Sequence, residues 1–226
     1  MSCWAGASWG IIRRVAQAFT LFGRSSSHFT RVARIFAAEL GVAYDYAVVS
    51  DITSLDEQAY GQNPALKVPS LTGPNGPFFG SLNVCRELAR ASERRPALLW
   101  PEDCASSLLS NAHELVVHAM SVEVALIMSK IGAVPGSPPS APESKLRASL
   151  SKTLAWLDSR WSQVLSQLPA RDLSFLEVSA YCLITHLPFR EIASVDQFTS
   201  LSSFAEECGK RESARSTTYR FDVAPA

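Results

Sequence analysis

The stretch from residue 19 to residue 41 constrains the fold of this chain more than any other. A short apolar run, 19–22, breaks at Gly23 into polar residues, among them three consecutive serines. Apolar residues then recur at the spacing of one buried helix face: Phe29, Val32, Ala33, Phe36, Ala37 and Leu40. This pattern predicts a strand, a loop and a helix, with Gly41 ending the helix in a left-handed conformation.

The serine run, 25–27, falls where this helix should begin. A serine at a helix N-terminus accepts a hydrogen bond from a free backbone amide, and the positive end of the helix dipole favours an anion. We therefore predict a position for a developing negative charge at this point. The Tyr- and Val-rich residues 42–49 that follow predict a second strand.

A proline marks the next part of the chain. Pro69 interrupts the strand-like run 66–71, and proline is confined to edges, strand starts or bulges because it cannot donate to a sheet ladder. Two interpretations are open, a plain edge-strand proline and a proline after a cis bond, and a cis bond would leave the preceding backbone groups exposed to a ligand. Turn residues at 72–77 predict a hairpin, and Ser81 begins a further helix.

The pattern changes after a charged, proline-containing segment at 92–102, which is typical of a linker between domains. Beyond it the apolar residues keep only helical spacing, and helices are expected over 103–131, 145–168, 175–187 and around 198–205, before a polar tail from Gly209. The predicted organisation is an N-terminal extension (1–16), an α/β domain (17–91), the linker (92–102) and an all-helical domain (103–226).

Composition excludes some partners. Lys+Arg and Asp+Glu are equal at 21 each, so no net field favours nucleic acid or an anionic membrane, and no run of about 18 apolar residues predicts a membrane span. Five cysteines without metal-type spacing indicate reduced thiols in a cytoplasmic protein. His113, His118 and His186 are candidate metal ligands, but His113 and His118, which lie on one predicted helix, do not share a face of it, so no metal site is expected.

Several segments share their order and spacing with one known family. They are Ser27-His-Phe-Thr-Arg-Val-Ala-Arg34, Asn63-Pro-Ala-Leu-Lys-Val-Pro69, Leu99-Trp-Pro-Glu-Asp103, the capping box Ser174 to Glu177, and the tail 211–222. They look like that family's active-site helix start, its NPxxKVP element, its interdomain linker, its second-domain capping box and the tail of its bacterial members. In these features the chain resembles the cytosolic glutathione transferase superfamily, in its bacterial type with an active-site serine.

The resemblance implies the fold and a catalytic residue. The fold would be an α/β N-terminal thioredoxin-like domain followed by an all-α C-terminal helical bundle. Ser27 would be catalytic, because a hydroxyl that donates a hydrogen bond to the glutathione sulfur favours the thiolate. Ser25 and Ser26 are the alternative donors. Phe22 stands near the position where other branches of the superfamily place a tyrosine.

The same carry-over assigns the glutathione contacts. The backbone of Val68, before a cis Pro69, would pair with the cysteinyl part of glutathione. Lys67 would approach the glycine carboxylate, and Ser81 would hold the γ-glutamyl carboxylate.

Two further positions belong to the implied site. Phe29 would contribute to the wall around glutathione and the second substrate. Gly80 stands where the family has an acidic residue, which removes one charge-assisted hydrogen bond, typically worth about 1.5–3 kcal/mol.

The implied activity is a detoxification reaction, in which glutathione is the co-substrate and its thiolate is added to a small hydrophobic electrophile by a cytoplasmic homodimer. Two alternatives stay open. One is a transferase-fold binding or regulatory protein without catalytic activity, which Gly80 favours. The other is a glutathione-dependent isomerase, lyase or peroxidase.

Overall fold

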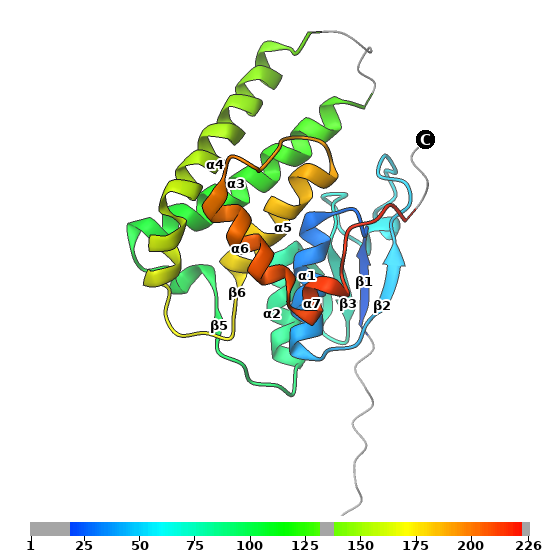
Figure 1. The fold of residues 1–226 in the computed structure, drawn as a ribbon. Coiled ribbons are helices and arrows are strands. Elements are labelled where there is room, and N and C mark those ends of the chain that lie inside the picture. Colours follow the sequence, from blue (N-terminus) through cyan, green and yellow to red (C-terminus); the bar gives the residue numbers. More distant parts are fainter. Residues whose placement is uncertain (1–18, 132–137, 223–226) are drawn as a thin grey trace, which may run out of the picture.

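The computed structural model describes residues 19–131 and 138–222 (Figure 1). The predicted N-terminal extension, 1–16, lies outside the described residues. The first half contains, in order, β1 (Thr20–Gly23), α1 (His28–Leu40), β2 (Asp45–Val48), the short 3₁₀ helix η1 (Glu57–Tyr60), β3 (Ser70–Gly73), β4 (Gly76–Phe79) and α2 (Ser81–Ala91). These elements follow the predicted strand, helix, strand, hairpin and helix.

The four strands form one mixed sheet in the order β2-β1-β3-β4. Strand β1 runs parallel to β2, whereas β3 is antiparallel to both β1 and β4. Phe22 pairs with Ser70, and Ser70 pairs with Phe79. The end of β1, the start of β3 and the end of β4 therefore lie at the same edge of the sheet. Helices α1 and α2 cover one face of the sheet (Figure 1).

Helix α1 begins and ends where the sequence predicts. The Ser27 hydroxyl accepts a hydrogen bond from the Thr30 amide at 3.2 Å. Gly41 ends the helix with a φ of 66°, and its position is close-packed, because a Cβ there would lie 2.8 Å from Arg94 Nε. The buried face, which includes Val32 and Phe36, packs into the core.

The second half is helical: α3 (Ser107–Ser129), α4 (Ala141–Gln167), α5 (Phe175–Phe189), α6 (Thr199–Gly209) and α7 (Glu212–Arg215). Helices α3 and α4 lie side by side as a long pair (Figure 1). By length and composition, α3 alone among the described helices could cross a membrane, but it packs against α4 and α5 in the bundle. Helix α5 also packs against α1 and so joins the helices to the sheet-bearing half.

The structure differs from the sequence prediction in four places. Helix α4 begins at Ala141, because Ser140 caps it and Pro142 is tolerated in a first turn. The predicted linker contains β5 (Leu98–Leu99), which pairs with β6 (Leu173–Ser174). The predicted polar tail contains α7. The capping box is only half made, since Ser174 accepts from the Glu177 amide while the Glu177 carboxylate pairs with Arg171.

A buried arginine of α1 ties the two halves together. Arg31 is 4% exposed, and its guanidinium donates to Thr185 Oγ1 at 3.0 Å, to Tyr181 Oη at 2.9 Å and to the Ala214 carbonyl at 3.1 Å. It also lies 4.3 Å from the centre of the Tyr219 ring. None of these partners is an acid. They come from α5, from α7 and from the C-terminal segment, so one cation of α1 connects all three parts of the chain.

Replacing this arginine should destabilise the protein strongly. We expect Arg31→Ala to lower the free energy of unfolding by roughly 3 kcal/mol, because buried partners lose hydrogen bonds to a charged group. Urea denaturation measures the change. Arg215→Ala is the control, since its side chain is 62% exposed and its pair with Glu212 should contribute less than about 1 kcal/mol. Equal losses for the two variants would contradict the structural role of Arg31.

Candidate functional site

The predicted site residues meet at one edge of the sheet. Ser27 follows β1, Pro69 precedes β3, and Gly80 and Ser81 follow β4, so the strand register brings all of them to the same end. The Gly80 amide donates to the Pro69 carbonyl at 3.0 Å, which fixes the start of α2 beside the proline. The Val68–Pro69 bond is cis, as predicted. The fold thus builds one compact site from three distant segments.

The three serines have different environments. Ser25 and Ser26 are buried, whereas Ser27 is half-buried at the start of α1. Ser25 is held by its backbone, since its amide donates to Asp222 Oδ2 at 2.6 Å. The Ser26 carbonyl accepts from His186 Nε2 at 2.8 Å. The Ser27 hydroxyl accepts from the Thr30 amide and keeps its proton for another acceptor, and Ser27 is the most exposed of the three serines.

The turn before the cis proline is held by Asn63. This side chain is buried, donates to the Lys67 carbonyl at 2.8 Å and accepts from the Ala65 amide at 3.0 Å. Among the described residues, no hydrogen bond uses the amide or carbonyl of Val68. The Lys67 side chain is exposed. The segment therefore presents unpaired backbone groups and a cation at the site edge.

Gly80 has a backbone conformation that explains its lack of a side chain. Its φ is 79° and its ψ is 150°, a region that is essentially restricted to glycine. No atom lies within 4 Å of the position that a Cβ would take, so the constraint is conformational and not steric. The backbone conformation at position 80 therefore disfavours every residue with a side chain, including the acidic residue that the family has there.

A hollow lies between this edge and the helices of the second half. Its volume is about 280 Å³. Its walls include Phe29 and Phe79, Gly80 and Ser81 at the start of α2, His113, Val117 and Met120 of α3, and Phe175 of α5. The hollow is mostly apolar, and its polar lining side chains are Ser81 and Asn83 of α2, His113 of α3 and Ser179 of α5.

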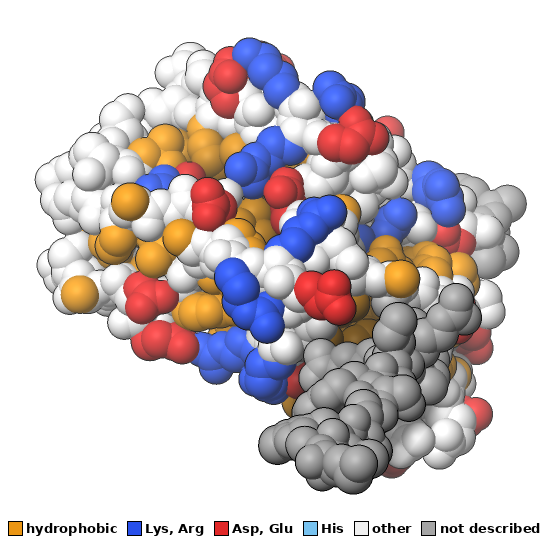
Figure 2. Space-filling view, turned by 90° about the horizontal axis from the view of Figure 1, so that it is seen from below, with side chains coloured by type: hydrophobic (Ala, Val, Ile, Leu, Met, Phe, Trp, Pro, Cys, Tyr) orange, Lys and Arg blue, Asp and Glu red, His pale blue; other side chains and the backbone are white. Residues whose placement is uncertain are grey.

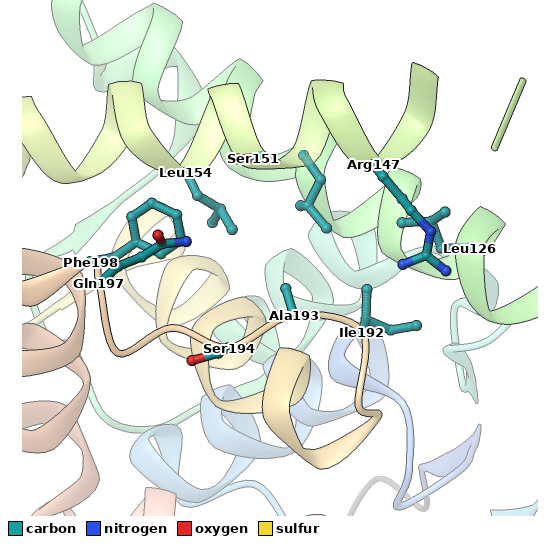
Figure 3. Close-up of a pocket in the computed structure, with 10 residues that line it drawn as sticks. Leu126, Arg147, Ser151, Leu154, Ile192, Ala193, Ser194, Gln197 and Phe198 are labelled. Carbon is teal, nitrogen blue, oxygen red and sulfur yellow. The ribbon is translucent and has the colours of Figure 1, made fainter. Parts of the chain in front are cut away.

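A second hollow, of about 180 Å³, lies between α4 and the segment 192–198 (Figure 3). Its one charged lining residue, Arg147, is already paired with Glu143 at 2.7 Å. None of the predicted site residues lines it. This hollow is separate from the site at the sheet edge.

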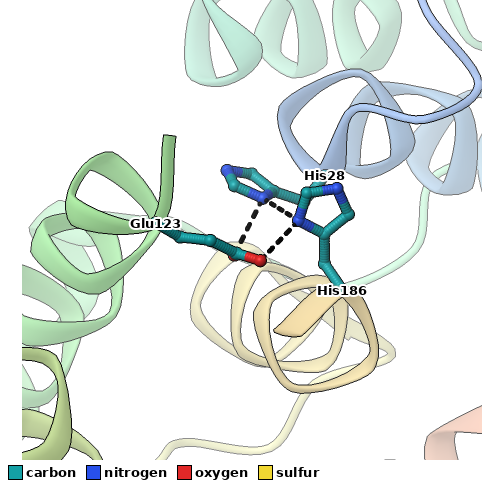
Figure 4. A group of neighbouring side chains, drawn as sticks. All are labelled: His28, Glu123 and His186. Atoms are coloured by element: carbon teal, nitrogen blue, oxygen red, sulfur yellow. Dashed lines mark hydrogen bonds and ion pairs between the residues drawn. The ribbon is translucent and has the colours of Figure 1, made fainter. Parts of the chain in front are cut away.

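Three buried titratable side chains meet behind the start of α1. His28 of α1, Glu123 of α3 and His186 of α5 are each at most 1% exposed (Figure 4). His186 Nδ1 lies 2.8 Å from His28 Nδ1 and 2.8 Å from Glu123 Oε1. His28 Nδ1 lies 3.2 Å from Glu123 Oε2. We refer to these three residues as the buried triad.

The environment shifts the pKa values of the triad. Burial lowers the pKa of His28, an effect opposed by its hydrogen bond with Glu123 and reinforced by the charges of His186 and Arg190. Burial acts to raise the pKa of Glu123, but hydrogen bonds with both histidines outweigh it and the pKa is lowered. The carboxylate form of Glu123 and the neutral form of His28 are therefore favoured.

The described cysteines are poor nucleophiles. Burial raises the pKa of Cys182 to about 12 and that of Cys208 to about 11, and it also raises the pKa values of Cys85 and Cys104. A thiol reacts as its thiolate. These four cysteines therefore favour the thiol form and are not suited to nucleophilic attack.

The surface carries charges of both signs. On the face shown in Figure 2, basic and acidic side chains lie next to one another, and neither sign forms a continuous patch. This arrangement agrees with the equal numbers of acidic and basic residues.

Solved structures share this fold over most of the chain. A glutathione transferase family member from Pseudomonas fluorescens, with bound glutathione, is 19% identical, covers 89% of this chain and 99% of its own, and has a TM-score of 0.73. A glutathione S-transferase from Methylobacterium radiotolerans, in complex with glutathione sulfonate, is 17% identical, with coverages of 92% and 99% and a TM-score of 0.71. These likenesses confirm the glutathione transferase fold. No curated protein matches.

The sequence itself matches one family model. Residues 21–96 match the model described as the N-terminal domain of glutathione S-transferase, and this stretch contains Ser27, Pro69 and Ser81. Residues 21–96 are therefore similar to a glutathione S-transferase N-terminal domain, and the chain as a whole has the glutathione transferase fold. The predicted fold class is confirmed. The catalytic and binding roles of the individual residues, the division into domains, the dimer and the cytoplasmic location stay predictions.

Sequence reasoning missed two features of this glutathione transferase fold. It did not find the buried triad, although Glu123 stands between apolar residues of α3 and His28 directly follows Ser27. It also did not find the contact between Asp222 and Ser25, because nothing in a polar tail reveals where it folds back.

The Asp222 contact should be needed for an ordered serine loop. The Asp222 side chain is 7% exposed, so Asp222→Ala would leave the Ser25 amide buried without a partner, at a cost of about 1–3 kcal/mol. Hydrogen exchange of residues 24–27 should become faster. The exposed Asp196→Ala is the control. Unchanged exchange in the Asp222 variant would show that the loop does not depend on this contact.

The conformation of Gly80 gives a second prediction. We expect Gly80→Ala to lower the free energy of unfolding by about 1–3 kcal/mol despite the open space, because alanine is strained at this φ and ψ. Thermal and urea unfolding measure it. Gly209→Ala should be neutral or stabilising, since Gly209 ends α6 and a Cβ there makes ordinary contacts. A stabilising Gly80→Ala would be inconsistent with the backbone described.

Proposed function

We propose that this protein is a glutathione transferase that adds the thiolate of glutathione to a small hydrophobic electrophile. The observation that carries the proposal is the meeting of Ser27, the cis Val68–Pro69 bond and Ser81 at one edge of the sheet. A hydroxyl at a helix start, free backbone groups beside it and a second helix start match the chemistry of a small peptide thiol with two carboxylates. The proposed enzyme is a cytoplasmic homodimer.

Each part of glutathione has a proposed partner. The Val68 amide and carbonyl, which are unpaired among the described residues, would bind the cysteinyl backbone. Ser81, at the positive end of α2, would hold the γ-glutamyl carboxylate. The exposed Lys67 would approach the glycine carboxylate. The sulfur would then face Ser27.

The chemistry would depend on the thiolate. A hydrogen bond from the Ser27 hydroxyl and the dipole of α1 both favour the charged sulfur over the thiol. The thiolate attacks the electrophilic carbon, a C–S bond forms, and the electron pair moves to the leaving group or the activated π system. The apolar wall of the hollow, with Phe29, Val117 and Phe175, would hold the electrophile.

The neighbours support this ligand. Solved structures of the same fold from Pseudomonas fluorescens and Methylobacterium radiotolerans hold glutathione and glutathione sulfonate. At 17–19% identity these ligands belong to those proteins, and they make glutathione the first ligand to test here.

One observation favours a second candidate, a non-catalytic binding protein of the same fold. Gly80 supplies no carboxylate to the γ-glutamyl group, and its conformation resists a side chain. In the proposed enzyme the α2 N-terminus and Ser81 hold this group without the acid. A Gly80→Glu variant should bind glutathione more tightly if the rest of the pocket is intact, at some cost in stability.

Calorimetric titration with glutathione and with S-hexylglutathione separates the two candidates. Micromolar to low-millimolar binding of both supports a glutathione site beside an apolar pocket. Turnover with an aromatic halide or an activated alkene then supports the transferase. Binding without turnover across such a panel would favour the binding protein, and absence of binding would overturn glutathione as the ligand.

Replacing the proposed donor should separate catalysis from capping. Ser27→Ala and Ser140→Ala each remove a helix cap that accepts at 3.2 Å, and each should cost about 1 kcal/mol of stability. Only Ser27→Ala should lower kcat, by roughly 10–100-fold, with little change in glutathione affinity, because it removes a hydrogen bond to the thiolate. Steady-state kinetics and titration measure both. Unchanged kcat in Ser27→Ala would move the role to Ser25 or Ser26.

A further inference from the structure

The buried triad holds three ligand atoms at one point (Figure 4). The two imidazole Nδ1 atoms and the Glu123 carboxylate face one another across 2.8, 2.8 and 3.2 Å. They come from α1, α3 and α5, so they are held by three different helices. A contact this close between buried polar atoms needs protons or a cation between them.

Protons alone pair these atoms poorly. His186 Nε2 must carry a hydrogen, because the Ser26 carbonyl only accepts. The three groups make three pairwise contacts. If they share one proton, one of these contacts brings two lone pairs together. If each Nδ1 carries a proton, the two N–H groups face each other across 2.8 Å. Two arrangements of two protons give every contact a donor and an acceptor, but both require a protonated Glu123 and make one Nδ1 lone pair accept two hydrogen bonds.

A second observation points to a ligand. Glu123 Oε2 is fully enclosed, and its polar neighbour among the described residues is His28 Nδ1 at 3.2 Å, a contact that is too poorly aligned to satisfy the oxygen fully. The outer ring nitrogen of His186 donates to a backbone carbonyl, which is the usual second contact of a metal-binding histidine. One cation between the side chains would accept lone pairs from both Nδ1 atoms and from the Glu123 carboxylate, so that no two lone pairs would face each other.

We propose that His28, Glu123 and His186 form a binding site for Zn²⁺ or a divalent transition metal of similar ligand preference. Two imidazole nitrogens and a carboxylate oxygen are ligands that Zn²⁺ accepts. Bonds of roughly 2.0–2.1 Å in a tetrahedron place the ligand atoms about 3.3–3.4 Å apart, so the side chains need to separate only slightly. Water would complete the coordination.

The proposed metal has a structural consequence. It would join α1 and α5 directly behind the serine loop and fix the His186 ring that holds the Ser26 carbonyl. The site is therefore distinct from the proposed glutathione contacts of Ser27, Val68 and Ser81, and it does not depend on their assignment.

Metal analysis tests the proposal on the whole protein, produced without a histidine tag. After removal of free metal, mass spectrometry should find about one Zn²⁺ per chain. Chelator-treated protein should regain a melting temperature higher by roughly 5–10 °C when Zn²⁺ is added well above its dissociation constant. Co²⁺ should give visible absorption bands, which report on wild-type protein even if a variant fails to fold.

Variants locate the site. Glu123→Gln and His186→Gln should lose the bound metal, the thermal shift and the Co²⁺ bands. His118→Gln, a change of an exposed histidine on the same helix as Glu123, should keep all three. Wild-type protein that binds neither Zn²⁺ nor Co²⁺ would overturn the proposal. Metal retained by both triad variants, or lost by His118→Gln, would do the same.

Discussion

The buried carbonyl group of Ser26 is the constraint on which much of this structure depends. It lies in the loop between β1 and α1, where no sheet or helix partner is available, and a buried carbonyl without a donor is costly. His186 supplies the donor from α5. For that histidine to reach the loop, α5 must lie against α1, and this packing fixes the relation between the sheet-bearing half and the helical half. The geometry of the serine loop is therefore decided by a residue 160 positions away.

The C-terminal segment completes the same arrangement from the other side. Asp222 accepts from the Ser25 amide, and Arg31 gathers α5, α7 and the ring of Tyr219 around its guanidinium. The loop is thus held by its backbone at two successive residues, while the hydroxyl of the third serine caps α1 and keeps its own proton unassigned. Rigid support and a free functional group are arranged on adjacent residues of one short segment.

Local signals predicted much of the fold. The period of apolar residues in α1, the cap at Ser27 and the left-handed Gly41 follow from preferences that act within a few residues, and each is found in the structure. The cis bond before Pro69 is also found, but it was expected from the family resemblance, because local preference alone favours the trans form. The β5–β6 pairing and the buried triad depend on contacts between segments far apart, so no local period reveals them. The site edge was predictable in part, because a family resemblance placed Ser27, Pro69 and Ser81 together, whereas the conformation of Gly80 was not.

The short β5–β6 ladder changes how the segment between the two halves should be understood. Ala97 accepts from the amides of Asp172 and Leu173, and its own amide donates to the Asp172 carboxylate at 2.7 Å. Main-chain hydrogen bonds thus attach this segment, which its composition predicted to be a linker, to the residues just before α5. The ladder fixes the later part of the connecting segment to the helical half, so the stretch between α2 and the helical half that lacks ladder pairing is shortened to residues 92–96.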